Sequence, residues 1–215
     1  MNNLFKVFAA ITMATLTLTL QAQDEKAKEI LDELSEKTRQ YPTITSTFTF
    51  TLEDKAADIE QVQEGDLKMK GKKYYIKLGE NQIYSDGDTR WTYNEEMNEV
   101  YIDYADMEEG LNPGDIYTIW ESGFKNYYKG EETLNGSAHH VIKLVPEDPS
   151  EKSYHTVLVY VDQGKMEVSK IEIMGKQGDN YTYTVKKFNT DASYSDDTFV
   201  FDSADYPGVD EIDNR

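Results

Sequence analysis

The sequence contains no cysteine, which excludes disulfide bonds, thiolate nucleophiles, cysteine-ligated zinc and lipid anchors attached to cysteine. Positive charge is also scarce: 22 lysines and arginines face 41 aspartates and glutamates, giving a net charge of −19. A chain this acidic lacks the basic surface that binds nucleic acid phosphates or anionic lipid headgroups. We therefore expect no nucleic-acid partner and no electrostatic docking on membranes.

The most apolar stretch of the chain is too short to span a bilayer, for which about 20 residues are needed. This stretch, Val7–Leu20, has fourteen residues and follows the single positive charge of Lys6. Ala22 then supplies the small residue that precedes signal-peptidase cleavage sites. The pattern predicts a cleaved signal peptide at residues 1–22. A single exported, soluble domain is expected at residues 23–215, without an acyl anchor because no cysteine stands at the cleavage point.

Catalytic and metal-binding motifs are missing as well. The sequence has no G-x-S-x-G, no G-x-x-x-x-G-K-[ST] and no H-E-x-x-H. Ser122 and Lys125 match S-x-x-K, but this short pattern arises by chance and its companion motifs are absent. His139 and His140 are neighbours on an expected strand, so their rings point to opposite faces and cannot share an ion. We predict two surface or half-buried histidines, no enzymatic activity, and no cofactor or metal.

What the sequence does contain is regular apolar periodicity. A helix is predicted at Asp24–Arg39, because four of its apolar residues recur at helical spacing, and Pro42 ends it. These four residues are Ala27, Ile30, Leu31 and Leu34. Asn112-Pro113 is typical of the start of a second helix, which we expect to continue to Gly130. Its apolar residues at helical spacing are Ile116, Ile119, Trp120 and Phe124.

The period changes to two from Thr43 to Leu52, where every odd position is threonine. The even positions are Ile44, Ser46, Phe48, Phe50 and Leu52. Further strands are predicted at Ile59–Lys70, Lys73–Gly79, Gln82–Ser85, Arg90–Tyr93, Asn98–Tyr104, Ala138–Val145, Tyr154–Asp162, Glu167–Lys176, Tyr181–Asn189 and Thr198–Phe201. The predicted fold is α+β: about eleven strands in one curled antiparallel sheet, an unclosed half-barrel, with a helical lid over its concave apolar face.

Several motifs occur in the order found in a known family. The hairpin IYSDGDTRWTYN at Ile83–Asn94 is similar to a "v-S-D-G-x-x-x-W-x-Y-x" pattern, and Asp86–Asp88 supplies its turn. Ser46–Phe48 resembles an early "a-S-F" strand, and Glu64–Leu67 resembles an "x-G-x-l" strand. The ending, from Phe199 to Asp210, resembles "F-x-F-x-x-P-x-G-V-x". Together these patterns resemble the outer-membrane lipoprotein carrier family, LolA.

The resemblance implies an unclosed barrel with a helical lid, located in the periplasm. It also implies a carrier that takes acylated lipoproteins from an ABC-type extractor in the inner membrane and delivers them to an acceptor in the outer membrane. One departure concerns the lid. The family often has a "K-R-P" type segment whose arginine helps to latch the lid, whereas Met69–Lys73 has neither arginine nor proline. Lys70, Lys72 or Lys73 could substitute, although lysine lacks the planar fork of arginine.

An acyl chain gains about 0.8 kcal/mol per buried CH₂, so a carrier needs an apolar cavity that closes when it is empty. The candidate binding residues are apolar positions of the sheet and of the predicted lid. On the sheet they are Phe48, Phe50, Leu52, Leu67, Met69, Trp91 and Tyr93; on the lid they are Ile30, Leu31, Leu34, Ile116, Ile119, Trp120 and Phe124. The same periodicity would also describe an ordinary filled core.

The sequence therefore favours a monomeric periplasmic carrier of lipoproteins, and two binding alternatives stay open. One is a periplasmic module that senses lipid or a partner protein; such regulators usually carry an extra C-terminal domain, whereas this sequence ends at Arg215. The other is a carrier of glycolipid or another amphiphile. The strong net acidity also suggests a basic complementary patch on at least one partner.

Overall fold

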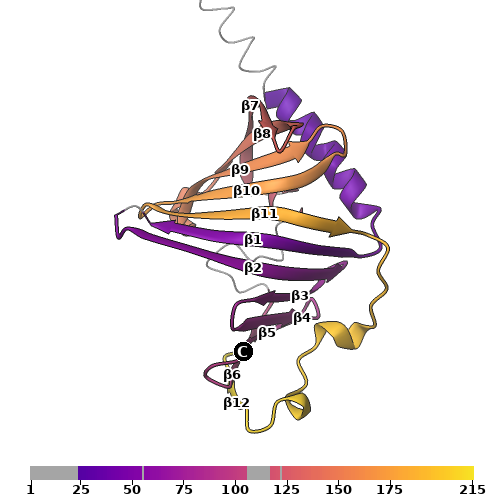
Figure 1. The fold of residues 1–215 in the computed structure, drawn as a ribbon, viewed down its shortest axis with the longest axis vertical. Helices are drawn as coiled ribbons and strands as arrows, with labels where there is room; N and C mark the ends of the chain where they lie inside the picture. Colours follow the sequence, from indigo (N-terminus) through magenta and orange to yellow (C-terminus); the bar gives the residue numbers. More distant parts are fainter. Residues whose placement is uncertain (1–23, 55, 106–116, 122) are drawn as a thin grey trace, which may run out of the picture.

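The computed structural model describes residues 24–54, 56–105, 117–121 and 123–215, and all of its strands form one open sheet of 12 strands (Figure 1). The order is β12-β6-β5-β4-β3-β2-β1-β11-β10-β9-β8-β7, and every pair is antiparallel except β12 and β6. The strands are β1 (Ile44–Asp54), β2 (Ile59–Lys70), β3 (Lys73–Leu78), β4 (Asn81–Ser85), β5 (Thr89–Asn94), β6 (Glu99–Tyr104), β7 (Phe124–Leu134), β8 (Ser137–Pro146), β9 (Tyr154–Asp162), β10 (Glu167–Gly175), β11 (Asp179–Asn189) and β12 (Asp210–Asp213).

The predicted fold class is confirmed, since the sheet is antiparallel-rich, does not close, and packs against a helix at residues 24–39. None of the helices in the described ranges combines the length and the apolar character needed to cross a membrane. Short 3-10 turns occur between strands. They are η2 (Ile119–Glu121), η3 (Pro149–Glu151), η4 (Asp196–Phe199) and η5 (Ser203–Asp205).

The predicted second helix is wrong from Ile119 onward. Ile119 and Trp120 lie in η2, and Phe124 begins the strand β7, which pairs with β8. The physical reason lies in the Asn135-Gly136 turn between these two strands. Both residues have positive φ, +51° and +85°, as a two-residue hairpin requires, and Asn-Gly is the strongest short-range hairpin signal. Ile116 and Asn112-Pro113 lie outside the described residues.

Two further predictions differ near the C-terminus. The strand expected at Thr198–Phe201 is replaced by the turn η4, in which the Val200 amide donates to the Asp197 carbonyl. The strand β12 was not predicted, because its four residues are mostly acidic and exposed. It forms through backbone pairing with β6 rather than through burial, and apolar periodicity gives no sign of such a strand.

The pairing register divides the sheet into two faces, since residues that pair across antiparallel strands point the same way. One row runs from Leu67 through Ile76 to Ile83, and it belongs to the face that packs against the helix. We call this the helix face. The neighbouring row runs from Tyr75 to Tyr84 on the opposite side, which we call the outer face.

The helix buries one stripe of side chains against the second half of the sheet. Leu34 and Ala27 are almost fully buried and belong to the same core cluster as Ile142, Val159 and Ile171 of β8, β9 and β10. These three residues are paired in register across the strands, so the helix rests on a continuous aliphatic surface. Burying each such side chain contributes about 1.5–3 kcal/mol, which fixes the helix on this face.

A segment after β11 runs to the other end of the sheet, where it leads into β12 (Figure 1). Its side chains pack on the outer face. We call residues 190–209 the C-terminal arm. The Tyr194 hydroxyl shares a 2.6 Å hydrogen bond with Thr45 Oγ1 of β1. Further along the arm, the rings of Phe201 and Tyr206 stack with their centroids 4.6 Å apart. Both rings pack on Tyr93 of β5, so the arm completes a second, smaller core.

The arm is also held by an ion-pair cluster. Lys70 Nζ donates to Asp196 Oδ1 at 2.8 Å, and Lys73 Nζ lies 2.8 Å from Asp196 Oδ2. Hydrogen bonds from Lys70 and Lys73 lower the pKa of Asp196 to about 2 from its ordinary 3.8. Two of the three lysines proposed as substitutes for a lid latch, Lys70 and Lys73, are therefore committed to the arm.

Replacing Asp196 is expected to remove a pH-dependent part of the stability. A depressed folded-state pKa stabilises fully above the unfolded value of 3.8, and this contribution is lost as the pH falls through about 2. Asp196→Asn should thus be less stable than the parent at pH 7, and most of this difference should be gone near pH 2. Urea unfolding at both pH values checks this, with Asp191→Asn, an exposed residue outside any ion pair in the described chain, as control. A stability difference as large at pH 2 as at pH 7 would contradict the expectation.

Candidate functional site

The helix face of β1 and its neighbours carries the candidate site. Phe48 is 1% exposed and its ring lies over Gly65 of β2, where the absence of a side chain leaves room for it. Phe50 follows on the same face and is only half-buried; its ring centroid is 5.1 Å from that of Tyr183 on β11. Leu52, also half-buried, lies opposite Tyr181. The face therefore changes along β1 from a packed core to a partly exposed apolar surface.

The turn η2 is attached to the helix by two polar contacts. Trp120 Nε1 donates a 2.7 Å hydrogen bond to Ser35 Oγ, and both side chains are buried. At the more exposed end, Arg39 Nη2 lies 3.7 Å from Glu121 Oε1. The buried bond fixes the position of the indole, whereas the exposed ion pair adds little because solvent screens it.

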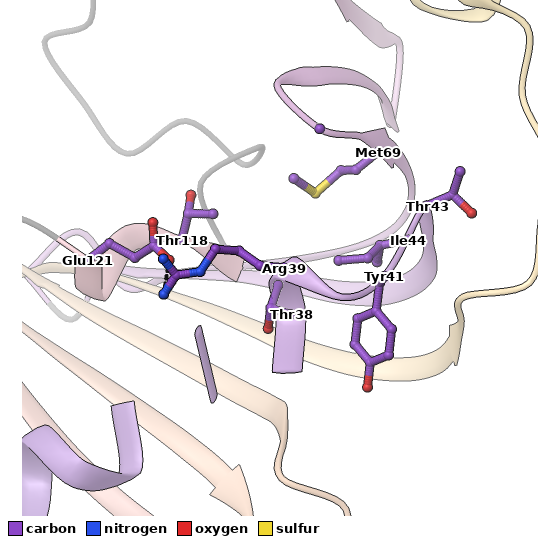
Figure 2. Close-up of a pocket in the computed structure, with 9 residues that line it drawn as sticks. Thr38, Arg39, Tyr41, Thr43, Ile44, Met69, Thr118 and Glu121 are labelled. Carbon is purple, nitrogen blue, oxygen red and sulfur yellow. Dashed lines mark ion pairs between the residues drawn. The ribbon is translucent and has the colours of Figure 1, made fainter. Parts of the chain in front are cut away.

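A pocket of about 220 Å³ opens beside this attachment (Figure 2). It lies between the end of the helix, the start of β1, the end of β2 and η2. Ile44 and Met69, which pair across β1 and β2 on the helix face, supply its apolar wall, and the Arg39–Glu121 pair supplies charge at one side. The arrangement can hold an apolar group whose end carries a polar substituent. The remaining lining residues are Thr38, Tyr41, Thr43, Gly71 and Thr118.

The structure brings most of the predicted site residues together on the helix face. From the sheet these are Phe48, Phe50, Leu52, Leu67 and Met69; from the helix, η2 and β7 they are Ile30, Leu31, Leu34, Ile119, Trp120 and Phe124. Ile30, Leu31 and Leu34 of the helix are packed core residues, each under 8% exposed. Ile116 lies outside the described residues.

Trp91 and Tyr93 were expected to belong to this group, but they lie on the outer face. Trp91 pairs with Tyr84 across the strands. The Tyr93 ring packs on the Tyr206 ring of the C-terminal arm, with the two ring centroids 4.4 Å apart. The reason is parity: β4 and β5 pair without a bulge, and the helix-face row passes through Ile83 and Thr92 instead. Aromatic character alone did not reveal this, because the arm gives the outer face an apolar cover of its own.

Sequence reasoning missed several apolar residues of the helix face. They are Leu78, Ile83, Tyr128, Tyr181 and Tyr183, all of which belong to or pack on the main core cluster. Tyr181 and Tyr183 could have been found from their alternation within a predicted strand, but their pairing with Leu52 and Phe50 joins residues about 130 positions apart. Such long-range pairing is fixed by the fold and not by local pattern.

The phenols on this face are kept neutral. A hydrogen bond to Asp179, together with burial, raises the pKa of Tyr181 to about 12, and burial also raises the pKa of Tyr183. Tyr117, 2% exposed beside η2, has its pKa raised by the same desolvation. These side chains carry no charge at neutral pH, so the helix face stays compatible with an apolar ligand.

The two adjacent histidines form no metal site. His140 Nδ1 lies 3.1 Å from the Tyr128 hydroxyl, whereas His139 Nε2 lies 2.9 Å from Ser169 Oγ. Their separation onto two faces is as predicted, but His139 is only 3% exposed rather than half-buried, because Ser169 and the Ser137 carbonyl satisfy both its nitrogens. Across the described ranges, no group of three or more histidines and carboxylates could hold a metal ion.

Ser35→Ala is expected to destabilise the protein by about 1–2 kcal/mol, because it leaves the buried indole N–H of Trp120 without its acceptor. Urea denaturation measures the loss. In a double-mutant cycle, Ser35→Ala should cost much less when Trp120 is already replaced by Phe, since no donor is then left unpaired. Equal costs in both backgrounds would show that the hydrogen bond is not the cause.

Comparison with known proteins is consistent with this architecture. The family model described as "Outer membrane lipoprotein carrier protein LolA" matches residues 39–202. An uncharacterized conserved protein from Thermus thermophilus shares the fold with a TM-score of 0.60 at 9% identity, covering 88% of this chain and 99% of that one. A LolA superfamily protein from Nitrosomonas europaea aligns at 13% identity with a TM-score of 0.46, covering 81% of this chain and 97% of that one. A chain of the Pseudomonas aeruginosa MucA/MucB complex aligns at 14% identity with a TM-score of 0.39, covering 83% of this chain and 62% of that one. No curated protein sequence matches.

Proposed function

The chain belongs to the LolA family of outer membrane lipoprotein carrier proteins, and we propose from this premise that it is a periplasmic carrier of acylated lipoproteins. In this proposal the helix face shields the acyl chains from water. The observation that carries the proposal is the half-buried apolar surface formed by Phe50, Leu52 and Tyr181, which lies next to a packed core and ends at the Asp179 carboxylate that accepts from the Tyr181 hydroxyl.

The energetics of acyl chains explain why such a surface is useful. Each buried CH₂ contributes about 0.8 kcal/mol, so a chain of about 16 carbons gains more than 10 kcal/mol when it leaves water. A soluble escort has to offer a comparable apolar contact and later give it up. The pocket walled by Ile44 and Met69 extends the helix face toward η2, where the Arg39–Glu121 pair can meet the polar end of a lipid.

Export and partners follow as further parts of the proposal. Residues 1–22 serve as the signal peptide, and the domain at residues 23–215 works as a monomer in the periplasm. It receives its cargo from an ABC-type extractor of the inner membrane and passes it to an acceptor of the outer membrane. No catalytic step is involved.

Native mass spectrometry of the mature protein, purified gently from the periplasm of its host, tests the proposal. We expect adducts that chemical analysis identifies as acylated lipoproteins, and saturable binding of a synthetic triacylated lipopeptide to the emptied protein. Adducts of glycolipid or phospholipid alone would instead support a carrier of other amphiphiles. An apo mass that persists when the lipopeptide is added would show that the helix face is a filled core, and would favour a module that senses a partner protein.

A further inference from the structure

A second pocket, of about 270 Å³, lies on the outer face, where the C-terminal arm passes over three strands. Lys68, Tyr75 and Tyr84 pair across β2, β3 and β4 and form its strand side. The arm supplies the other side with three carboxylates and an aromatic ring. The arm residues are Asp197, Thr198, Val200, Asp202, Asp205 and Tyr206.

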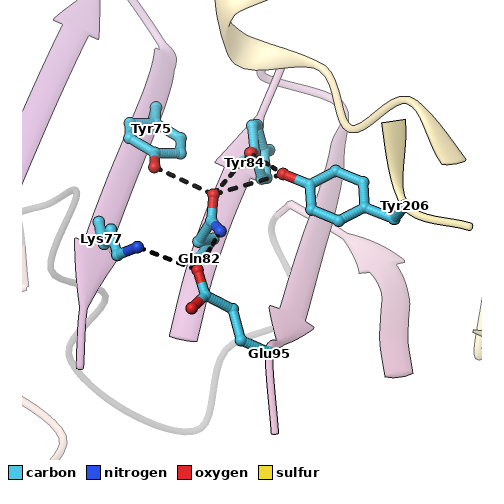
Figure 3. Close-up of polar contacts among 6 residues, drawn as sticks. All are labelled: Tyr75, Lys77, Gln82, Tyr84, Glu95 and Tyr206. Atoms are coloured by element: carbon cyan, nitrogen blue, oxygen red, sulfur yellow. Dashed lines mark hydrogen bonds and ion pairs between the residues drawn. The ribbon is translucent and has the colours of Figure 1, made fainter. Parts of the chain in front are cut away.

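The aromatic side of this pocket is held rigidly. The hydroxyls of Tyr75 and Tyr84 donate to Gln82 Oε1 at 3.1 and 2.9 Å, and the Tyr206 hydroxyl points at the same oxygen from 3.4 Å (Figure 3). Gln82 Nε2 in turn donates to Glu95, which also accepts from Lys77. A single amide therefore fixes three phenols, so their rings keep their position when a ligand approaches.

The acidic side is not neutralised. The Asp202 carboxylate accepts from the Ala204 amide, but those of Asp197 and Asp205 have no hydrogen bond or ion pair within the described part of the chain. Three carboxylates against one lysine give the pocket a net charge of −2, counted as +1 − 3. Because the described residues offer no cluster able to hold a metal, the chemistry favours an organic cation.

A contact between a cation and tyrosine rings already exists at the edge of the pocket. The ammonium group of Lys68 lies 4.9 Å from the centroid of the Tyr75 ring and 5.7 Å from that of Tyr194. Cations held over tyrosine rings in this way gain about 0.5–2 kcal/mol. The pocket volume of about 270 Å³ is smaller than that of pockets for drug-sized ligands, and it suits the end of one long side chain.

We propose that this outer pocket binds an arginine or lysine side chain presented by a basic segment of a partner protein. Its carboxylates pair with the cation, and the phenol rings of Tyr75, Tyr84 and Tyr206 flank it. Since the net charge of the chain is −19, the surrounding field attracts such a segment before contact. The pocket lies on the face opposite the helix, so the partner can dock whether or not the helix face is occupied, and the proposal does not depend on lipid binding.

Titration with the peptide acetyl-Gly-Arg-Gly-Arg-Gly-amide, followed by NMR of protein labelled with ¹³C on its tyrosine rings, tests the proposal. We expect saturable shifts of the Tyr75, Tyr84 and Tyr206 signals. Replacing both unpaired carboxylates in Asp197→Asn/Asp205→Asn should weaken binding about tenfold, as the loss of two partly exposed charge contacts implies.

A matched control removes the same two charges elsewhere. Glu29→Gln/Glu36→Gln alters exposed helix positions and should change the affinity less than twofold. Equal weakening in both double variants would mean that the peptide senses only the overall charge, and this would overturn the proposal. Shifts confined to tyrosines other than Tyr75, Tyr84 and Tyr206 would overturn it as well.

Discussion

Phe50→Glu is expected to weaken binding of a fluorescent long-chain acyl probe by about tenfold to a hundredfold. The change removes an aromatic contact worth about 1.5–3 kcal/mol and places a carboxylate where the proposed acyl chain would lie. Phe50 is half-buried beside Tyr181 and Tyr183, so the new carboxylate would face the ligand rather than bulk water. Fluorescence titration of the purified variant gives the affinity directly.

The same strand offers matched controls. Thr51 follows Phe50 in sequence but lies on the outer face, so Thr51→Glu adds the same charge away from the proposed ligand and should leave the affinity within twofold. Leu52→Glu returns to the helix face near the strand end, and it should reproduce the loss with less disturbance of the aromatic cluster. If Thr51→Glu and Leu52→Glu lose affinity equally, the helix face is not the binding surface.

Gly65→Ala is expected to lower the free energy of unfolding by about 2–3 kcal/mol. A Cβ at this position would lie 2.4 Å from Phe48 Cζ, and the Phe48 ring, 1% exposed and packed on Tyr183, has no free space to move into. Overpacking of this kind typically costs about 1–3 kcal/mol. Thermal or urea unfolding would measure the loss.

Gly164→Ala is the control for this substitution. Gly164 lies in the turn between β9 and β10, and a Cβ there would lie 3.4 Å from Asp162 Oδ1, which is an ordinary contact. It should therefore change the stability by less than 0.5 kcal/mol, as expected for a position outside the core (about ±0.5 kcal/mol). If Gly65→Ala were as stable as Gly164→Ala, the close contact between Gly65 and the Phe48 ring would not be a constraint.

The sequence was sufficient for most of the strands, because their signal is local. The alternating threonines of β1 and the turn at Asp86–Asp88 each report a backbone conformation within a few residues. It was insufficient where an element depends on a distant partner. The strand β12, for example, forms on β6, which is remote in sequence. The strand β7 was missed for another reason: the Asn135-Gly136 turn to β8 is a local signal, but Phe124 alone could equally belong to a helix.

The candidate site shows the same division. Phe48, Leu67 and Met69 were placed on one face because strand parity is local and the β1–β2 hairpin keeps it. Trp91 and Tyr93 were assigned to the same face, and this assignment was wrong, since the cover over them on the other face comes from Phe201 and Tyr206, more than a hundred residues further along the chain. No local pattern states which face of a sheet a remote segment will cover.

The central position of β1 has a consequence for the order in which the chain folds. β1 pairs with β2, its neighbour in sequence, and also with β11, where Thr45 lies opposite Asn189, a separation of 189 − 45 = 144 residues. Contacts between such remote segments form slowly, because a long loop has to close before any of them stabilises the structure. A chain emerging N-terminus first cannot complete its sheet until β11 has been synthesised. Under the proposed export, this delay keeps the polypeptide unfolded, and thus able to be translocated, until nearly its whole length has left the ribosome.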